Sequence, residues 1–174
     1  ILHLYYGKIN SQSVNVSQNK FQRHSGIVCN PFGDSNSVTC LLSYSSFTDN
    51  IANQWDCIDL WTVGAKYEIK NCNILRNTQS SSTQGIIYTQ GNLMIENSCI
   101  LENKGTYILY QYSSSYITTL SNCTIDTSSK YGSVVIQNTV TKSFINALNH
   151  MSTRNCNAEY DAVGILTPNI VQPS

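Results

Sequence analysis

The sequence predicts an all-β protein: a right-handed parallel β-helix of about five to six turns, each of roughly 26 residues, with a ladder of asparagine side chains. Three observations predict this solenoid: a composition rich in β-branched residues, a repeated six-residue element, and opposite charges at equivalent positions of successive repeats. We expect one β-helix domain over residues 1–166, with a less regular N-terminal turn or cap over 1–25. Residues 167–174 are expected to form an exit linker, in a chain that is a fragment of a longer one.

The composition favours strands over helices. The 174 residues include 18 Ile, 10 Val, 15 Thr and 11 Tyr, against 5 Ala, 4 Glu and 2 Met. Branched side chains are stiff about χ1 and fit a pleated surface better than a helical turn. Short apolar runs such as 85–88 and 93–95 are separated by Ser-rich and Asn-rich stretches such as 78–84, which are typical of turns.

A six-residue element recurs along the chain, with large apolar residues at its first and sixth positions. Its copies lie at 42–47, 69–74, 95–100 and 120–125, with a weaker copy at 148–153, so that the sixth positions are 27, 26, 25 and 28 residues apart. A unit of this size cannot bury its apolar face alone, and stacking buries it. The alternative, a sandwich or jelly roll, would need Asn-Gly or Asp-Gly hairpin turns, which this sequence lacks.

A second series of short apolar segments, also predicted to be strands, alternates with the copies of this element, at variable distances from them. These segments are 26–28, 58–60, 85–87, 108–110, 134–136 and 164–166.

Charged residues support the same alignment. Asp49, Arg76 and Glu102 alternate in sign at one repeat position, and Lys70 meets Glu96 at another. Opposite charges on neighbouring strands contribute about 0.2–1 kcal/mol, and like charges cost a similar amount. Because the alignment rests on apolar residues alone, this agreement is independent support for the register.

The third position of the repeated element holds Asn71, Asn97 and Asn122. Asparagine tolerates the left-handed backbone of a tight bend, and its amide can bond to the same amide one layer away. We therefore expect these three side chains to form an inward ladder at one corner.

These elements resemble those of known β-helix families. The Ile/Leu-x-Asn-x-x-Ile element is similar to the asparagine corner of pectate-lyase-type right-handed β-helices. Residues 47–50 match the Phe-x-x-Asn motif of polymorphic-membrane-protein repeats, and 74–77 and 100–103 match it with Ile in place of Phe. The low-charge style, rich in Ser, Asn, Tyr and Cys, is similar to large β-helix surface proteins of parasitic flagellates.

The resemblance covers about residues 26–166. It implies an extracellular or cell-surface location, anchorage by a segment outside this chain, and a role in adhesion or antigenic variation. We therefore expect a host-cell protein or glycan as the partner, or self-association.

The charge balance argues against two other classes of partner. Ten Lys and Arg residues balance ten Asp and Glu residues, and only 11% of the chain is charged. A neutral surface offers no basic footprint for nucleic acid and no attraction to anionic lipid. We expect neither a nucleic-acid partner nor membrane contact from this segment.

No catalytic or metal-binding constellation stands out, so we expect a non-enzyme without cofactor or metal. Asp56 and Asp59 form a close acidic pair, flanked by Trp55 and Trp61. Their spacing along a bend and a strand predicts side chains that point apart, with Asp56 in a turn and Asp59 exposed. The alternatives are a polysaccharide lyase or hydrolase of the same fold, and a structural fibre or filament subunit.

The candidate binding residues are aromatic. Tyr112 and Tyr116 flank a serine run in a loop whose counterparts in neighbouring repeats lack aromatic residues. Tyrosine offers a rigid contact surface with a polar tip at low entropic cost. We predict a recognition surface at Tyr112 and Tyr116, with Trp55 and Trp61 as further candidates.

Seven cysteines, an odd number, are expected to be mainly buried thiols, although a partial set of disulfides remains open. Asn15 and Asn122 begin the two N-x-Ser/Thr sequons. Because the expected ladder engages Asn122, we predict a glycan on Asn15 only.

Overall fold

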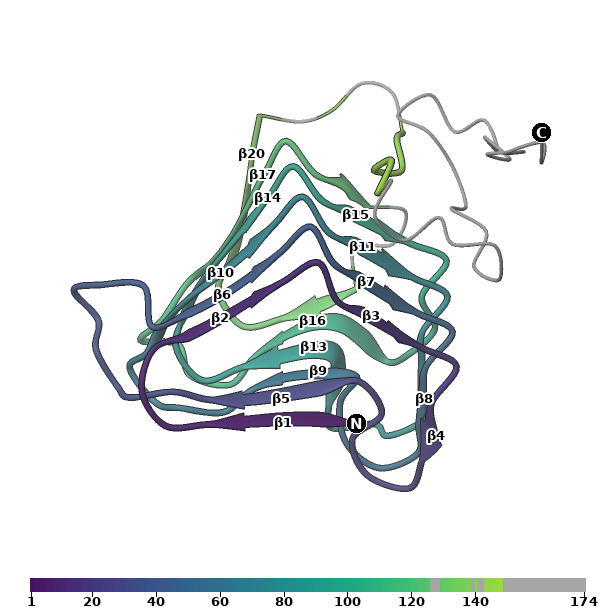
Figure 1. Cartoon of the computed structure of the whole chain (residues 1–174), viewed down its shortest axis with the longest axis horizontal. Helices are drawn as coiled ribbons and strands as arrows, with labels where there is room; N and C mark the ends of the chain where they lie inside the picture. Colours follow the sequence, from purple (N-terminus) through teal and green to yellow (C-terminus); the bar gives the residue numbers. More distant parts are fainter. Residues whose placement is uncertain (126–128, 139, 141–142, 149–174) are drawn as a thin grey trace, which may run out of the picture.

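The computed structural model describes residues 1–125, 129–138, 140 and 143–148, and it confirms an all-β fold. The described part contains twenty short strands and no helix. All strand pairs are parallel, and the strands stack in register into a solenoid whose walls are separate sheets (Figure 1). None of the described residues belongs to a helix that could span a membrane.

Four sheets form the walls. Sheet A consists of β1 (Leu2–Tyr5), β5 (Ile27–Asn30), β9 (Ile58–Leu60), β13 (Gly85–Thr89), β16 (Tyr107–Gln111) and β19 (Lys130–Tyr131). Sheet B consists of β2 (Ile9–Gln12), β6 (Cys40–Ser43), β10 (Lys66–Lys70), β14 (Asn92–Glu96), β17 (Thr118–Ser121) and β20 (Val134–Gln137). Sheet C consists of β3 (Asn15–Ser17), β7 (Ser46–Thr48), β11 (Asn73–Leu75), β15 (Cys99–Leu101) and β18 (Thr124–Ile125). Sheet D consists of β4 (Lys20–Phe21), β8 (Ile51–Ala52) and β12 (Thr78–Gln79).

The register predicted from the repeated element is confirmed for its four main copies. In sheet B, Leu42, Ile69, Ile95 and Leu120 are successive partners, and their side chains are buried in the core. The charge pairs follow from this register. Arg76 Nε lies 2.9 Å from Asp49 Oδ1, and Lys70 Nζ lies 3.7 Å from Glu96 Oε2.

One strand assignment is wrong. Residues 134–136 were expected in the series that forms sheet A, but they lie in β20 of sheet B, where Ile136 pairs with Leu120. The place in sheet A is taken by β19, where Tyr131 pairs with Tyr110. The last layer is shorter than 26 residues, because its sheet B partners are only 16 positions apart, so a fixed period misplaces its strands.

The N-terminal residues form regular strands, whereas most of the C-terminal segments predicted from sequence lie outside the described residues. Residues 1–25 were expected to be a less regular cap, yet β1 to β4 form a full set of strands that pair with β5 to β8. The segments 149–153 and 164–166 and the linker 167–174 lie outside the described residues.

The first corner of each layer, between sheets B and C, has a left-handed residue. The corner residues are Ser13, Tyr44, Asn71, Asn97, Asn122 and Asn138, with φ between 47° and 59°. The left-handed conformation is as predicted, but the side chains do not form the interior: Asn71 and Asn97 are half-buried and Asn122 is exposed. The expectation that these three asparagines point inward is therefore wrong: none of the three is buried, whereas Cys72 and Ser98, which follow the first two, are fully buried.

A different set of asparagines points into the solenoid. This amide column consists of Asn19, Asn50, Asn77 and Asn103, one residue after a second series of left-handed positions at the corner between sheets C and D. The Nδ2 of Asn50 donates to Oδ1 of Asn77 at 3.0 Å, and Nδ2 of Asn77 donates to Oδ1 of Asn103 at 3.1 Å. The side-chain amides of Asn50, Asn77 and Asn103 also bond to backbone groups of neighbouring layers, as buried polar groups require.

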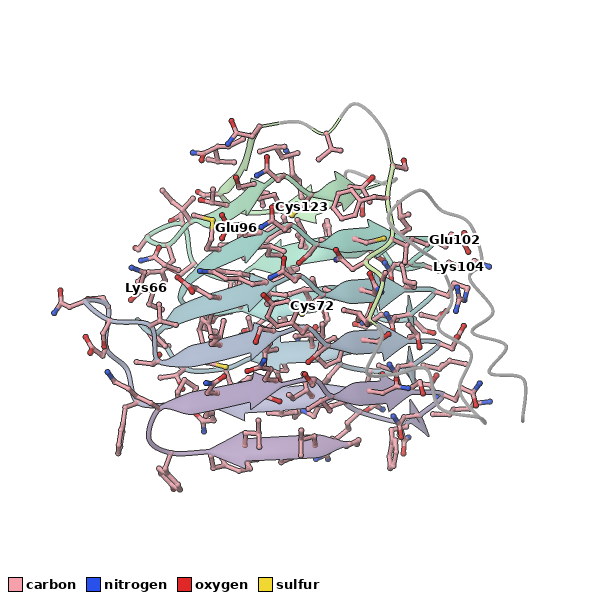
Figure 2. All side chains as sticks on the ribbon, turned by 45° about the horizontal axis from the view of Figure 1, so that its top comes forward. Lys66, Cys72, Glu96, Glu102, Lys104 and Cys123 are labelled. Atoms are coloured by element: carbon pink, nitrogen blue, oxygen red, sulfur yellow. The ribbon has the colours of Figure 1, made fainter. Side chains whose placement is uncertain are left out.

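All six described cysteines are free, and all but Cys123 are buried. Cys72 and Cys123 lie two layers apart in one column, with Ser98 between them, which rules out a disulfide between the two (Figure 2). Burial raises the pKa of both Cys57 and Cys72 to about 12, so these thiols stay protonated at neutral pH. They behave as small apolar side chains in the core.

Candidate functional site: an aromatic and acidic face

The outer face of sheet A carries one continuous column of side chains. Its members, in successive pairings, are His3, Val28, Asp59, Tyr88, Tyr110 and Tyr131. Successive side chains of a strand point to opposite faces. In β9, Ile58 and Leu60 enter the core, and Asp59 between them therefore faces outward.

The two tryptophans lie on either side of β9 and begin an aromatic stack. The rings of Trp55 and Trp61 lie 6.4 Å apart and nearly parallel, and Trp61 stacks on Tyr88 at 6.0 Å. The stack continues from Tyr88 to Tyr110 at 5.6 Å and from Tyr110 to Tyr131 at 4.5 Å. Five aromatic rings thus follow one face of the solenoid across successive layers.

Beside the tryptophans, three titratable side chains converge. Ligand atoms of His24, Asp56 and Asp59 all lie within 4.8 Å of one another. His24 precedes β5, and its Nδ1 lies 3.2 Å from Asp59 Oδ2. Asp56 lies in the bend before β9, where its Oδ1 accepts a hydrogen bond from the Gly85 amide at 3.1 Å.

The expectation for the acidic pair is therefore wrong on two counts. Asp56 and Asp59 converge instead of pointing apart, because the bend before β9 brings Asp56 back over the strand. Asp59 faces outward as alternation predicts, yet it is only 1% exposed. Outward-facing side chains can be buried by their neighbours, and here the carboxylate contacts His24 and shares the recess with Trp55 and Trp61.

Burial dominates the electrostatics of this cluster. It raises the pKa of Asp56 to about 9, with a further contribution from Asp59, and it raises the pKa of Asp59 to about 7. Burial, followed by the nearby His3 and Arg23, lowers the pKa of His24 to about 4. These shifts share one cause: removal from water disfavours the charged form of each group.

A recess opens where the acidic cluster meets the tryptophans. It has a volume of about 140 Å³, and its walls include His3, Tyr5, His24, Trp55, Asp59 and Trp61. A second hollow of about 490 Å³ shares His3, Tyr5, His24 and Trp55 with it and adds Phe21, Gln22 and Arg23. Together they form one binding-sized depression with aromatic walls and a few polar groups, a composition typical of ligand sites.

The structure brings some of the predicted binding residues together. Trp55 and Trp61, 36% and 45% exposed, line the same recess. Tyr112 is 60% exposed, and its ring lies 6.1 Å from that of Tyr88, so it joins the same face. Tyr116 is half-buried in the turn between β16 and β17, where its amide donates to the Ser113 carbonyl.

Sequence reasoning missed several members of this face. Tyr88 and Tyr110 share a repeat position with Asp59, and that spacing could have placed them beside it. His24 carries no such signal, because it lies outside the repeated elements and reaches Asp59 from the preceding layer.

The two sequons are similar in exposure. Asn15 is exposed in β3, and Asn122 is exposed at a corner. The argument that a ladder engages Asn122 is wrong, so exposure does not separate the two sites.

The fold and the site define a parallel β-solenoid with an aromatic and acidic recess on one wall. No known protein family, no curated protein and no solved structure matches the chain.

Proposed function

We propose that this protein is a non-catalytic, extracellular or cell-surface module that binds glycans through the recess at Trp55 and Trp61. Its scaffold is a right-handed parallel β-helix of about five to six turns, in which the amide column acts as the asparagine ladder. The intended partner is a carbohydrate of a host-cell surface, and the module serves adhesion.

The single observation that carries this proposal is the pairing of two exposed indole rings with a carboxylate and an imidazole in one recess. The C–H face of a sugar ring packs against aromatic surface, while hydroxyl groups need a few placed acceptors and donors. Trp55 and Trp61 offer the apolar surface, and Asp59 and His24 offer the polar contacts. The adjoining hollow of about 490 Å³ leaves room for a second sugar unit.

The geometry favours binding over hydrolysis. A glycoside hydrolase places two carboxyl groups on either side of the scissile bond, roughly 5–9.5 Å apart. Here Asp59 lines the recess, whereas Asp56 lies behind it, 2% exposed and held by the Gly85 amide. A sugar in the recess would meet one carboxyl group and not two.

Glycan binding is tested by probing a glycan array with the labelled protein. Wild-type protein is expected to bind a restricted set of glycans, and Trp61→Ala is expected to weaken that binding roughly tenfold, because it removes both the apolar area that the ring buries and a stacked contact worth about 0.5–1.5 kcal/mol beyond that area. Tyr112→Ala should weaken it less, because Tyr112 reaches the recess only through Tyr88.

Tyr44→Ala is the matched control, since Tyr44 is 46% exposed at the distant sheet B to sheet C corner. Equal loss in Tyr44→Ala and Trp61→Ala, or the absence of any bound glycan, would contradict the proposal.

The proposed extracellular location predicts that an N-linked glycosylation site is occupied. Expression through a eukaryotic secretory pathway should place an N-linked glycan on Asn15, which is exposed in β3. Glycopeptide mass spectrometry after deglycosylation in heavy-oxygen water reads the occupancy of Asn15 and Asn122 separately. An unmodified Asn15 in secreted protein would remove this support for the proposed location.

A further inference from the structure

The cluster of His24, Asp56 and Asp59 has the composition of a metal site. One imidazole nitrogen and two carboxylate oxygens lie within 4.8 Å of one another, and all three residues are buried. They come from two layers of the solenoid: His24 precedes β5, and the two aspartates belong to the bend and strand of β9. The scaffold on both sides is fixed by the parallel pairing of β5 and β9.

A second, independent observation points to a missing partner. Two buried polar atoms of this cluster, His24 Nδ1 and Asp59 Oδ1, make no hydrogen bond among the described residues, and the nearest polar contact of His24 Nδ1 is Asp59 Oδ2 at 3.2 Å. The remaining atom of this kind in the described part is Gln84 Oε1. Buried polar groups are almost always satisfied, so two orphaned atoms aimed into one cluster indicate a ligand between them.

The surrounding charges do not compensate the carboxylates. Within 4 Å, among the described residues, the one basic partner of the pair is His24 Nδ1. The Arg23 guanidinium makes a cation–π contact with Trp55, 5.2 Å from the centre of the ring. Burial favours the neutral form of both carboxyl groups, and a bound cation would supply the countercharge that their ionised forms lack.

We propose that His24, Asp56 and Asp59 bind one divalent transition-metal ion, of which zinc is the best match. Zinc accepts imidazole nitrogen and carboxylate oxygen at about 2.0–2.2 Å, and a tetrahedral site with such bonds holds its ligand atoms about 3.3 Å apart. The distance of 3.2 Å between His24 Nδ1 and Asp59 Oδ2 already meets this requirement. Calcium and magnesium prefer all-oxygen sites with more ligands, which this cluster does not offer.

The surroundings of the three ligands suit a bound metal ion: a backbone amide holds one carboxylate, and the recess gives access to solvent. The Gly85 amide holds Asp56 Oδ1 in place, as outer hydrogen bonds do for metal ligands. His24 and Asp59 also line the recess, so an ion held by three protein ligands would have its fourth position open to solvent. This opening gives the ion a path of entry and places it beside the two tryptophans. The metal site goes beyond glycan binding, and its test needs no glycan.

The test uses the full chain, stripped of metal with EDTA and titrated with ZnCl₂ by isothermal titration calorimetry. We expect one equivalent to bind, with a dissociation constant below about 10 µM, and the melting temperature to rise on binding. Asp59→Asn and His24→Gln should each weaken zinc binding at least tenfold, the lower end of what outer-shell substitutions alone cause. Asp59→Asn should melt no lower than wild type in EDTA, because the amide removes a buried charge.

Cobalt supplies a readout that does not depend on a variant folding. CoCl₂ bound to nitrogen and oxygen ligands should give visible d–d bands and quench Trp55, whose ring lies 4.6 Å from that of His24.

Two matched substitutions separate the site from surface binding. Asp34→Asn removes a half-buried loop carboxylate, and His3→Ala removes the exposed imidazole nearest His24; both should keep stoichiometric zinc binding. Four results would overturn the proposal: no stoichiometric zinc binding by wild type, undiminished binding by Asp59→Asn, loss of binding on His3→Ala alone, or a preference for calcium over zinc.

Discussion

Asn77→Ala is expected to lower the free energy of unfolding by on the order of 3–5 kcal/mol, because it removes a fully buried side chain from the middle of the amide column. The side chain of Asn77 is fully buried and takes part in four hydrogen bonds. Its loss removes the Oδ1 acceptor of the Asn50 backbone N–H, one of the two acceptors of Asn50 Nδ2, and a donor to the Phe47 carbonyl. Each buried group left unsatisfied costs about 1–3 kcal/mol.

Urea unfolding followed by circular dichroism measures this change, and Asn71→Ala is its matched control. Asn71 occupies the left-handed corner at φ 53° and is half-buried, so its replacement should cost about 1 kcal/mol, the penalty of a side chain less suited to that conformation. A loss at Asn71 as large as that at Asn77 would mean that the inward column has been assigned to the wrong asparagines.

Gly26→Ala is expected to lower the free energy of unfolding by about 3 kcal/mol and to disturb the acidic cluster as well. A Cβ atom at Gly26 would lie only 2.3 Å from the carbonyl oxygen of Cys57 in the next layer. Backbone cannot yield as a flexible side chain does, so the two layers must separate. His24 lies on one of these layers and Asp56 on the other, so the separation should pull the cluster apart.

The same unfolding measurement, with zinc titration alongside it, checks this prediction. Gly105→Ala is the control, because a Cβ there would lie 3.3 Å from the nearest atom and the site is exposed. It should change the free energy of unfolding by about 1 kcal/mol or less. Stability and zinc affinity in Gly26→Ala equal to those of Gly105→Ala would contradict the close approach of the two layers.

The register of the solenoid could be predicted from sequence because one physical requirement repeats in every layer. Leu42, Ile69, Ile95 and Leu120 each have to enter the same core, and the salt bridge of Asp49 with Arg76 confirms the alignment. The two asparagine series were visible for the same reason. Which of the two series points inward could not be predicted, because periodicity gives the position of a residue along the layer and not the direction of its side chain.

The acidic cluster could not be predicted, because its side chains are not part of the repeated pattern. Residues 53–57 align with 22–26 of the preceding layer, where Ser25 stands at the position of Asp56, so the repeat does not indicate a carboxylate there. Alternation along β9 correctly places Asp59 on the outer face. Its neighbours in the recess include His24 of the preceding layer, whose position only the assembled solenoid defines.

Intrinsic tryptophan fluorescence tests the proposed binding face most directly, because the chain has only two tryptophans and both line the recess. Titration with the glycans selected on the array should produce a saturable change in emission, since a sugar would cover rings that are 36% and 45% exposed. The midpoint should match the affinity measured by calorimetry, and Trp61→Ala should shift it. Glycan binding that saturates by calorimetry while the tryptophan emission stays unchanged would place the ligand elsewhere and contradict the account.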